Sequence, residues 1–184
     1  MNLAFEDKLY TNNFLDKIAK NISEEEARIL YQSNLVESES SDMALMDSFI
    51  AWNYAKSNRL KIPNGYVSNI HFLLMRRINR DIAGRYRTVQ VVVGDREDTF
   101  PPEKIEVAMK EWFMNFKELK DSTEEIKSEH VKFLKIHPFV DGNGRTSRIL
   151  MNIQNLNSGY GLRLIMKSDS LKEKIEYDYM EWFK

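Results

Sequence analysis

Apolar side chains recur at the spacing of an α-helix along most of this chain. The clearest stripe consists of Ile105, Ala108, Met109, Trp112 and Phe116. Similar stripes occur at Phe14, Ile18 and Ile22, at Ile29, Leu30, Leu35 and Val36, at Met46, Phe49, Ile50 and Ala55, and at Val67, Ile70, Leu73, Leu74 and Ile78. Only 7 of the 184 residues are Gly and 4 are Pro, so few positions interrupt these helices. The pattern predicts a mainly α-helical fold.

Capping residues mark two helix starts. Ser122 is followed within three positions by two glutamates, which is typical of an N-cap and predicts a helix that runs to about Ile136. Asp169 and Ser170 similarly predict the start of a final helix that continues through Trp182.

One segment departs from the helical pattern. Residues 88–93 (TVQVVV) are rich in β-branched side chains, which favour a strand. A Gly-Asp pair follows, and then Thr99 and Phe100 resume the extended pattern. The sequence therefore predicts one small β-hairpin within residues 84–102.

The composition is that of an ordinary globular protein. A length of 184 residues suits a single domain over residues 1–184 that can bury a core without disulfides. The chain has no Cys, which excludes thiolate catalysis and Cys-ligated zinc. The formal net charge is −1, which argues against a bulk polyanion binder.

Nothing in the chain predicts a membrane or nucleic-acid partner. The N-terminus lacks a basic flank followed by an apolar run, and no apolar run approaches the ~20 residues that cross a bilayer. We expect a soluble, cytoplasmic protein. A local basic run is predicted to be a solvated face or a partner site rather than a nucleic-acid patch; it consists of Arg76, Arg77, Arg80, Arg85 and Arg87.

The densest group of chemically active residues lies in segment 137–148 (HPFVDGNGRTSR). Pro138 disfavours helical geometry at His137, so the preceding helix is predicted to end there. Gly142 and Gly144 flank a single residue, which suits a backbone whose N–H groups face an anion. A helical pattern resumes afterwards, with Ile149, Leu150, Ile153 and Leu156.

This segment combines the groups that phosphate-transfer chemistry uses. The N-terminus of the following helix attracts phosphate, and Arg145 and Arg148 share one helix face on which they can bind further phosphate oxygens. Asp141 offers a hard oxygen ligand for Mg²⁺. His137 can act as a general base near neutral pH. Each feature alone is common in loops, but their combination within twelve residues indicates a phosphate-transfer site.

Segment 137–148 resembles the active-site motif of the Fic (filamentation induced by cAMP) family, H-x-F-x-[DE]-G-N-G-R-x-x-R. All eight fixed positions match, namely His137, Phe139, Asp141, Gly142, Asn143, Gly144, Arg145 and Arg148. The likeness covers about residues 30–165. It includes Gly84-Arg85-Tyr86-Arg87 and Phe100-Pro101-Pro102, which flank the predicted hairpin. The resemblance implies a mostly helical domain of the Fic type, in which the hairpin is called the flap.

The resemblance implies AMP transfer from ATP to a Tyr, Thr or Ser hydroxyl of a target protein, with release of pyrophosphate. By this likeness His137 would deprotonate the hydroxyl, and Asp141 would hold the Mg²⁺ that bridges the α- and β-phosphates. The flap would pair in β fashion with the main chain of the target; its docking residues would be Val91, Val92 and Val93.

The remaining motif positions would bind the nucleotide. The resemblance assigns an anion hole to Asn143 and to the backbone of Gly142 and Gly144. It assigns contact with the phosphate chain to Arg145 and with the γ-phosphate to Arg148. Relatives that transfer a phosphate instead of AMP carry Lys at the position of Gly144, so the glycine favours AMP transfer.

A second segment resembles the inhibitory helix of many Fic proteins, [ST]-x-x-x-E-[GN]. It lies in a predicted helical region at about 24–42, with Ser33 and Glu37 on one helix face. Glu37 is predicted to form a bidentate pair with Arg148 and so to keep the γ-phosphate away. Ser38 departs from the pattern, because Gly or Asn there favours a left-handed cap. The alternative is that Glu37 only begins a solvated acidic stretch.

Two other functions stay open at this point. Glu37 can instead position a water that removes AMP from a modified protein, which would make the chain a de-AMPylating hydrolase. The chain can also be a nucleotide-binding interaction module without turnover, although such a module has no need of His137. The sequence does not name the target, the nucleotide base, the signal that displaces Glu37, or whether a homo-oligomer forms.

Overall fold

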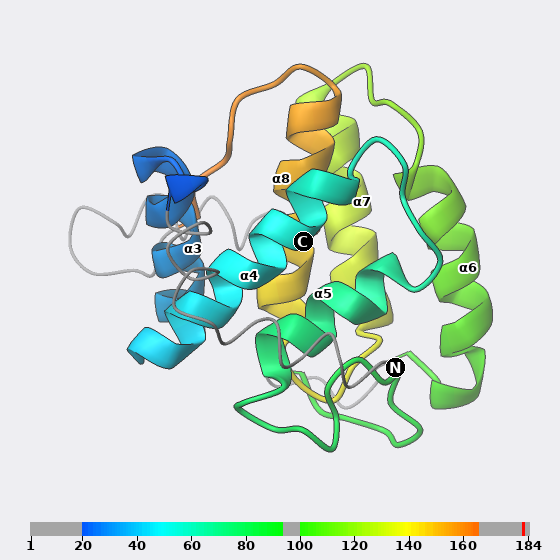
Figure 1. The fold of residues 1–184 in the computed structure, drawn as a ribbon. Coiled ribbons are helices and arrows are strands. Elements are labelled where there is room, and N and C mark those ends of the chain that lie inside the picture. The colour runs from blue at the N-terminus through cyan, green and yellow to red at the C-terminus, as the bar shows by residue number, and fades with distance from the viewer. Residues whose placement is uncertain (1–19, 94–99, 166–181, 183–184) are drawn as a thin grey trace.

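The computed structural model describes residues 20–93, 100–165 and 182. These residues form six α-helices and one short 3-10 helix (Figure 1). The elements are α3 (Glu24–Val36), α4 (Asp42–Asn58), α5 (Tyr66–Met75), η1 (Pro102–Lys104), α6 (Ile105–Phe116), α7 (Thr123–Ile136) and α8 (Asn143–Asn157). The predicted mainly α-helical fold is confirmed.

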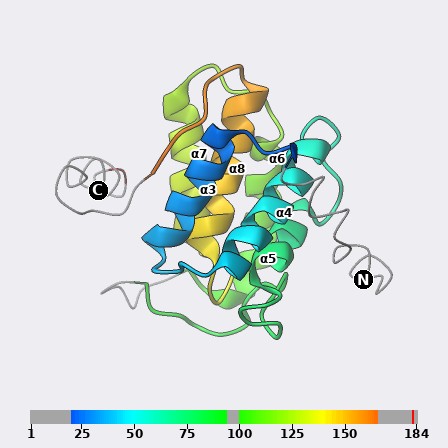
Figure 2. The same ribbon diagram turned by 60° about the vertical axis from the view of Figure 1, so that its left-hand side comes forward.

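Helix α8 is the centre of the bundle. It packs against α3, α4, α5 and α7, while α6 packs against α7 on the side away from α3 (Figures 1 and 2). The core around it is built from large, fully buried side chains, among them Trp52, Tyr66, Phe133, Phe139 and Ile153. The N-terminus of α8 therefore lies where α3, α5 and the end of α7 meet.

Most helix bounds follow the sequence signals. Ser122 caps α7 by accepting a hydrogen bond from Glu125 N, and α7 ends at Ile136 as predicted. Helix α5 is shorter than its apolar stripe: it ends at Met75, so Ile78 lies beyond it and is 40% exposed. The stripe at 14–18 and the final helix predicted from Asp169 lie outside the described residues, apart from Trp182.

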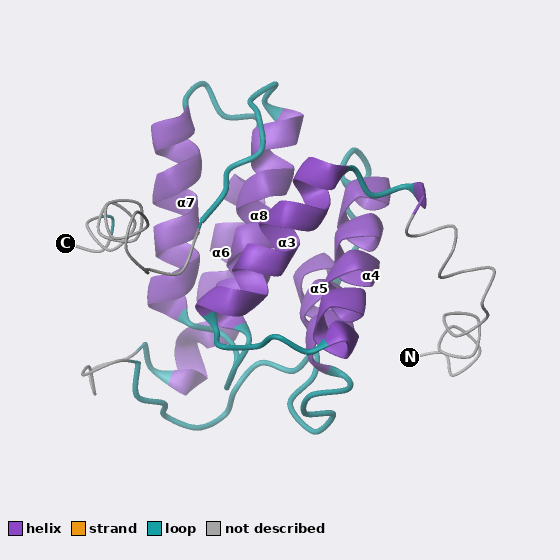
Figure 3. Cartoon of the chain, turned by 90° about the vertical axis from the view of Figure 1, so that its left-hand side faces the viewer, coloured by secondary structure: helices purple, strands orange, loops and turns teal. Residues whose placement is uncertain are grey.

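The predicted β-hairpin is not confirmed. Residues 88–92 form a loop, Val93 is a single bridge residue, and residues 94–99 lie outside the described part; Figure 3 shows no strand in the residues that are coloured. The main-chain carbonyls of Val89 and Phe100 accept hydrogen bonds from Arg87. The guanidinium thus binds two carbonyls that a hairpin would offer to a facing strand.

The predicted solvated basic face is wrong for its buried members. Asp47 accepts hydrogen bonds from both Arg76 and Arg77, and its carboxylate is fully buried. These ion pairs fasten α4 to the end of α5. Arg87 is also buried. Among the residues that the structure describes, no helix is long and apolar enough to cross a membrane.

Candidate active site

His137 joins α7 to the loop in a strained conformation. It is the C-cap of α7, with φ 50° and ψ 62°, and its N–H donates to Phe133 O at 2.9 Å. A left-handed residue other than Gly costs roughly 1–2 kcal/mol. The prediction that Pro138 ends α7 at His137 is confirmed, and the strained residue is the one expected to act as the base.

Asn143 holds the middle of the loop. Its side chain accepts from Phe139 N at 2.9 Å and donates to Phe139 O at 2.8 Å. Both polar ends of this buried amide are therefore used inside the protein. The amide therefore serves first to hold the loop, and the main-chain N–H of Asn143 lies in the first turn of α8.

His71 on α5 holds the next part of the loop. Its Nδ1 accepts from Gly84 N at 2.8 Å, so the proton of the neutral ring is on Nε2, which donates to Asp141 O at 2.8 Å. The ring stacks on Phe139, with 3.7 Å between centroids. Burial lowers the pKa of His71 to about 4, so the ring stays neutral at physiological pH.

Two glycines make room at the start of α8. Gly142 is the N-cap, with φ 75°, and a Cβ there would meet Met75 Sδ at 2.8 Å. A Cβ at Gly144 would overlap Glu37 Oε1. No side chain caps α8, so the N–H groups of its first turn lie open to a bound anion.

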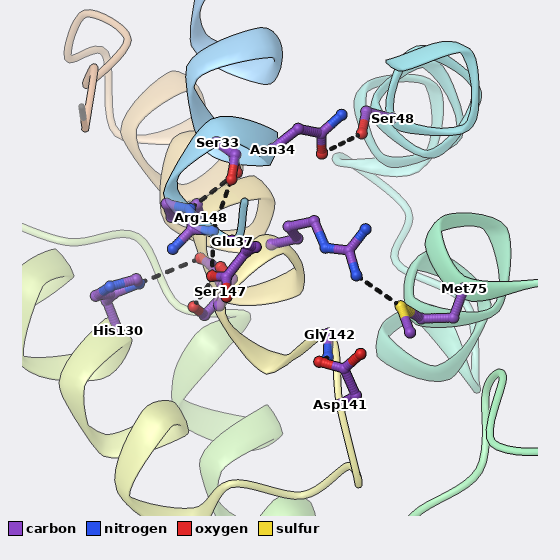
Figure 4. A network of polar contacts seen from close by, with 12 residues as sticks. Ser33, Asn34, Glu37, Ser48, Met75, His130, Asp141, Gly142, Ser147 and Arg148 are labelled. Atoms are coloured by element: carbon purple, nitrogen blue, oxygen red, sulfur yellow. Dashed lines mark hydrogen bonds and ion pairs between the residues drawn. The ribbon is translucent and has the colours of Figure 1, made fainter. Parts of the chain in front are cut away.

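The end of α3 reaches Arg148, as Figure 4 shows. The Arg148 guanidinium donates from Nε to Ser33 Oγ (2.8 Å) and from Nη2 to Ser33 O (3.0 Å). Its Nη2 also donates to Glu37 Oε1 at 2.6 Å. The predicted contact between Glu37 and Arg148 is present, but it is not bidentate, because the second half of the fork binds Ser33.

Ser38 completes the end of α3. It has φ 59°, and its N–H donates to Leu35 O, while Glu39 N donates to Asn34 O, each at 3.0 Å. These two hydrogen bonds make a Schellman cap with Ser38 in the left-handed position. The serine thus takes the conformation for which Gly or Asn is preferred.

Arg145 reaches α5 rather than joining the hydrogen bonds between Glu37 and Arg148. Its Nη2 lies 3.0 Å from Met75 Sδ, and the side chain is almost fully buried. Its Nε is buried without a hydrogen-bond partner among the described residues. A buried guanidinium with only a thioether as acceptor retains unused capacity for phosphate oxygens.

The environment of His137 keeps its imidazole neutral. Burial lowers its pKa, and the Arg87 charge adds to this, whereas the Leu134 backbone, Asp141 and Glu37 act in the opposite direction. A neutral imidazole is the form that accepts a proton.

Asp141 is the residue expected to hold Mg²⁺. Its Oδ1 accepts from Gly142 N at 2.6 Å, and the residue is exposed. The described residues hold no group of three or more His, Cys, Asp or Glu side chains that could hold a metal. A single exposed carboxylate fits an Mg²⁺ that is bound mainly by substrate phosphates and water.

The structure brings most of the predicted site residues together. The motif residues surround the start of α8, and Ser33 and Glu37 join them from α3. Val91, Val92 and Val93 lie in the loop that follows Arg87.

Two residues with a part in the site were not predicted. His71 could have been found, because it lies within the apolar stripe of α5, where a polar ring must be buried and paired. Arg87 belongs to a stretch that resembles the family, but the resemblance assigned it no role, because its partners are main-chain carbonyls that the sequence does not reveal.

Comparison with known proteins bears on this site. A family model described as the Fic/DOC family matches residues 61–154, which is 94 of the 184 residues. "Protein adenylyltransferase Fic" of Nematostella vectensis is 37% identical over 103 residues, covering 54% of this chain and 23% of that protein. "Protein adenylyltransferase fic-1" of Caenorhabditis elegans is 40% identical over 82 residues, covering 42% of this chain and 16% of that protein. The chain thus spans less than a quarter of the length of these curated relatives.

Solved structures show the same fold. Fic-1 from C. elegans superposes with a TM-score of 0.67 at 19% identity, covering 90% of this chain and 57% of that chain. A Fic domain containing signaling protein from Bacteroides thetaiotaomicron gives 0.63 at 18% identity, covering 92% and 75%. The match over more than half of the residues, together with the complete motif around α8, establishes that this chain belongs to the Fic/DOC family.

Proposed function

We propose that this protein is an adenylyltransferase that moves AMP from ATP to a Tyr, Thr or Ser hydroxyl of a target protein and releases pyrophosphate. The observation that carries the proposal is the start of α8. Open N–H groups, two buried arginines and a neutral His137 meet there around one exposed carboxylate. The curated relatives named protein adenylyltransferase support the same reaction.

Each group has a separate task in the proposed reaction. His137 takes the proton of the attacking hydroxyl while that oxygen bonds to the α-phosphorus and the bond to the β-phosphate oxygen breaks. The N–H groups of Asn143 and Gly144 and the Arg145 side chain bind phosphate oxygens, while the Gly142 N–H is bonded to the Asp141 carboxylate. Asp141 would hold Mg²⁺, which neutralises phosphate charge when bound.

The resting structure supports autoinhibition by α3. Glu37 Oε1 lies where a Cβ of Gly144 would be, beside the open helix start, and it binds the arginine expected to take the γ-phosphate. One carboxylate thus competes with a phosphate both for the helix N-terminus and for Arg148. ATP would have to bind with its terminal phosphate displaced, or α3 would have to move.

Removal of the Glu37 carboxylate tests the proposal. The Glu37→Gly chain is incubated with Mg²⁺ and ATP radiolabelled at the α-phosphate, in the presence of lysate proteins. We expect labelling to rise by at least about tenfold over the unaltered chain, which corresponds to about 1.4 kcal/mol of lost inhibition. The further change His137→Ala should abolish it.

A matched control is Glu39→Gly, which removes a carboxylate two residues further along. Glu39 accepts from Ser41 N rather than from Arg148, so labelling should stay near that of the unaltered chain. Absence of label in the Glu37→Gly chain across several lysates would refute AMP transfer. Equal labelling by both glutamate variants would refute the inhibitory role of Glu37.

The exposure of Glu37 favours one second candidate, removal of AMP from a modified protein. The Glu37 side chain is 35% exposed although it pairs with Arg148, so water reaches it beside the helix start. Release of AMP from an AMPylated target by the unaltered chain, and its loss in Glu37→Gly, would identify this activity.

A further inference from the structure

Arg87 is a buried arginine whose side-chain hydrogen bonds run to main-chain carbonyls. Nε donates to His137 O at 2.7 Å, and Nη1 donates to Val89 O at 2.8 Å. Nη2 donates to Phe100 O and, at 3.5 Å, to Ile136 O. One planar guanidinium therefore joins the end of α7 to two points on either side of the segment between Val89 and Phe100.

Three contacts of Arg87 fall on consecutive residues at the C-terminal end of α7. The main-chain N–H of Arg87 donates to Pro138 O at 2.9 Å, so one residue binds the carbonyls of Ile136, His137 and Pro138 in succession. Carbonyls at a helix end lack partners within the helix and carry partial negative charge, which a cation neutralises.

The contact with His137 bears on catalysis. His137 is held in the left-handed region, a conformation that a non-glycine residue keeps only when its surroundings enforce it. The hydrogen bond from Arg87 Nε fixes the direction of the His137 carbonyl, and with it the peptide plane that follows the imidazole-bearing carbon.

We propose that Arg87 is a positioning residue, which holds His137 in the backbone conformation that serves the transfer reaction. The inference rests on the AMP transfer proposed above. Arg87 touches the end of α7 and the loop beyond it, while the N–H groups for the anion lie on α8. Its loss should therefore lower the rate of transfer and leave the affinity for ATP unchanged.

The charge of Arg87 gives a second, separable effect. Burial is the main cause of the lowered pKa of His137, and Arg87 lowers it further. The other charged groups that act on the imidazole, Asp141 and Glu37, raise it. Arg87→Lys retains the charge but not the planar fork, whereas Arg87→Met loses both.

The test uses the full chain with Glu37→Gly as the parent. Three quantities are measured: the rate of AMP labelling at saturating Mg-ATP, the Kd for ATP by calorimetry, and the titration of His137 by ¹H–¹³C NMR. The chain has only three His, which makes the NMR assignment direct. Arg85→Met is the matched control, because Arg85 is exposed two residues earlier.

We expect Arg87→Lys to lower the labelling rate by roughly 10- to 100-fold, as displacement of a catalytic group by about 1 Å does. The Kd for ATP and the pKa of His137 should stay unchanged. Arg87→Met should lower the rate at least as much and raise the pKa of His137. Arg85→Met should leave all three quantities unchanged.

A merely structural role would give another pattern. Rate and ATP affinity would then fall together, and the resonance of His130, which lies against Ser147 instead, would shift as well; that result overturns the proposal. So does a Lys variant that retains more than about half of the parent rate. If Arg87→Met does not fold, the labelling rate of Arg87→Lys alone decides whether the proposal holds.

Failure of the proposed reaction is visible separately. If the parent transfers no AMP, the adenylyltransferase proposal falls. The contact of Arg87 with the His137 carbonyl is then tested by the ¹H–¹³C resonances of His137, which should shift in Arg87→Lys although the charge is retained. Unshifted His137 resonances in that variant overturn the inference.

Discussion

At Gly144 a single methyl group would disturb the closed arrangement of α3. A Cβ there overlaps Glu37 Oε1 and lies 3.0 Å from Arg148 Nη1. The Glu37 carboxylate is the end of a flexible, partly exposed side chain, so we expect Gly144→Ala to push it off Arg148 and to lower the free energy of unfolding of the unaltered chain by about 1 kcal/mol. In the Glu37→Gly chain the same change should cost less than about 0.5 kcal/mol, because the carboxylate is gone. Denaturant unfolding of the four chains measures this coupling.

The four chains (unaltered, Gly144→Ala, Glu37→Gly and the double variant) form a double-mutant cycle. Arg148 Nη1 remains in both backgrounds, so any cost from crowding that guanidinium cancels. Equal destabilisation of the two backgrounds by Gly144→Ala would show that the carboxylate does not occupy the space above Gly144.

Single residues show how far the sequence leads. The motif placed His137, Arg148 and the two glycines at one site, because their spacing belongs to one continuous loop and helix. It did not show that the Asn143 amide turns inward to Phe139, since side-chain direction depends on the packed loop. It also did not show that the Arg148 guanidinium donates hydrogen bonds to both Ser33 and Glu37.

Helix α3 ends in a cap that uses an unfavourable residue. Ser38 takes φ 59°, which costs a serine roughly 1 kcal/mol that a glycine avoids. We expect Ser38→Gly to raise the free energy of unfolding by about 0.5–1 kcal/mol and to lower basal AMP labelling, because the closed form gains stability. Thermal unfolding and the labelling assay measure the two effects.

Ser40→Gly serves as the comparison for this element. Ser40 is exposed and has no positive φ, so glycine there brings no relief of strain and should be neutral or slightly destabilising. A Ser38→Gly chain that labels more strongly than the unaltered chain would contradict the view that this cap stabilises the inhibitory contact.

At the level of elements, local signals predicted most helices well. Ser122 and the apolar stripe of α6 marked true helices because both signals are local in the sequence. The hairpin predicted from the β-branched run at 88–93 was not confirmed. Residues 88–92 form a loop whose Val89 carbonyl binds Arg87, and Arg87 is itself held by the His137 carbonyl far along the chain. The apolar stripe of α5 continues to Ile78 and so did not predict that the helix ends at Met75.

The whole molecule should lose stability in mild acid because two buried histidines resist protonation. Burial lowers the pKa of His71 to about 4 and that of His130 to about 3, both below the ordinary 6.5. The unfolded chain therefore binds more protons below pH 6.5, and stability present above that pH is lost as the pH falls toward 4 and then 3. At pH 5, which is 1.5 units below 6.5, each of the two histidines should lower the free energy of unfolding by about 2 kcal/mol.

Urea unfolding at pH 7.5 and at pH 5.0 measures this loss, in a range where ordinary carboxylates remain ionised. Histidine NMR on the folded chain should show that His71 and His130 do not titrate between these values. A free energy of unfolding that is the same at both pH values would rule out the neutral, buried state of the two rings.

The three hydrogen bonds between Arg148 and α3 also have a kinetic meaning. Helix α3 packs mainly against α4 and α8, and its last residue, Val36, also reaches the small apolar cluster around Ile126. Because it lies at the edge of the bundle, we expect α3 to open more readily than the helices of the core. If the proposed AMP transfer needs these contacts to break, the basal rate of transfer depends on the fraction of molecules in which Arg148 is released from Ser33 and Glu37. A tenfold change in that rate then corresponds to about 1.4 kcal/mol in the free energy that separates molecules with these contacts from molecules without them. Under the proposed AMP transfer, the background labelling by the unaltered chain would measure this conformational equilibrium, and amide exchange within α3 should change in parallel with it from one variant to the next.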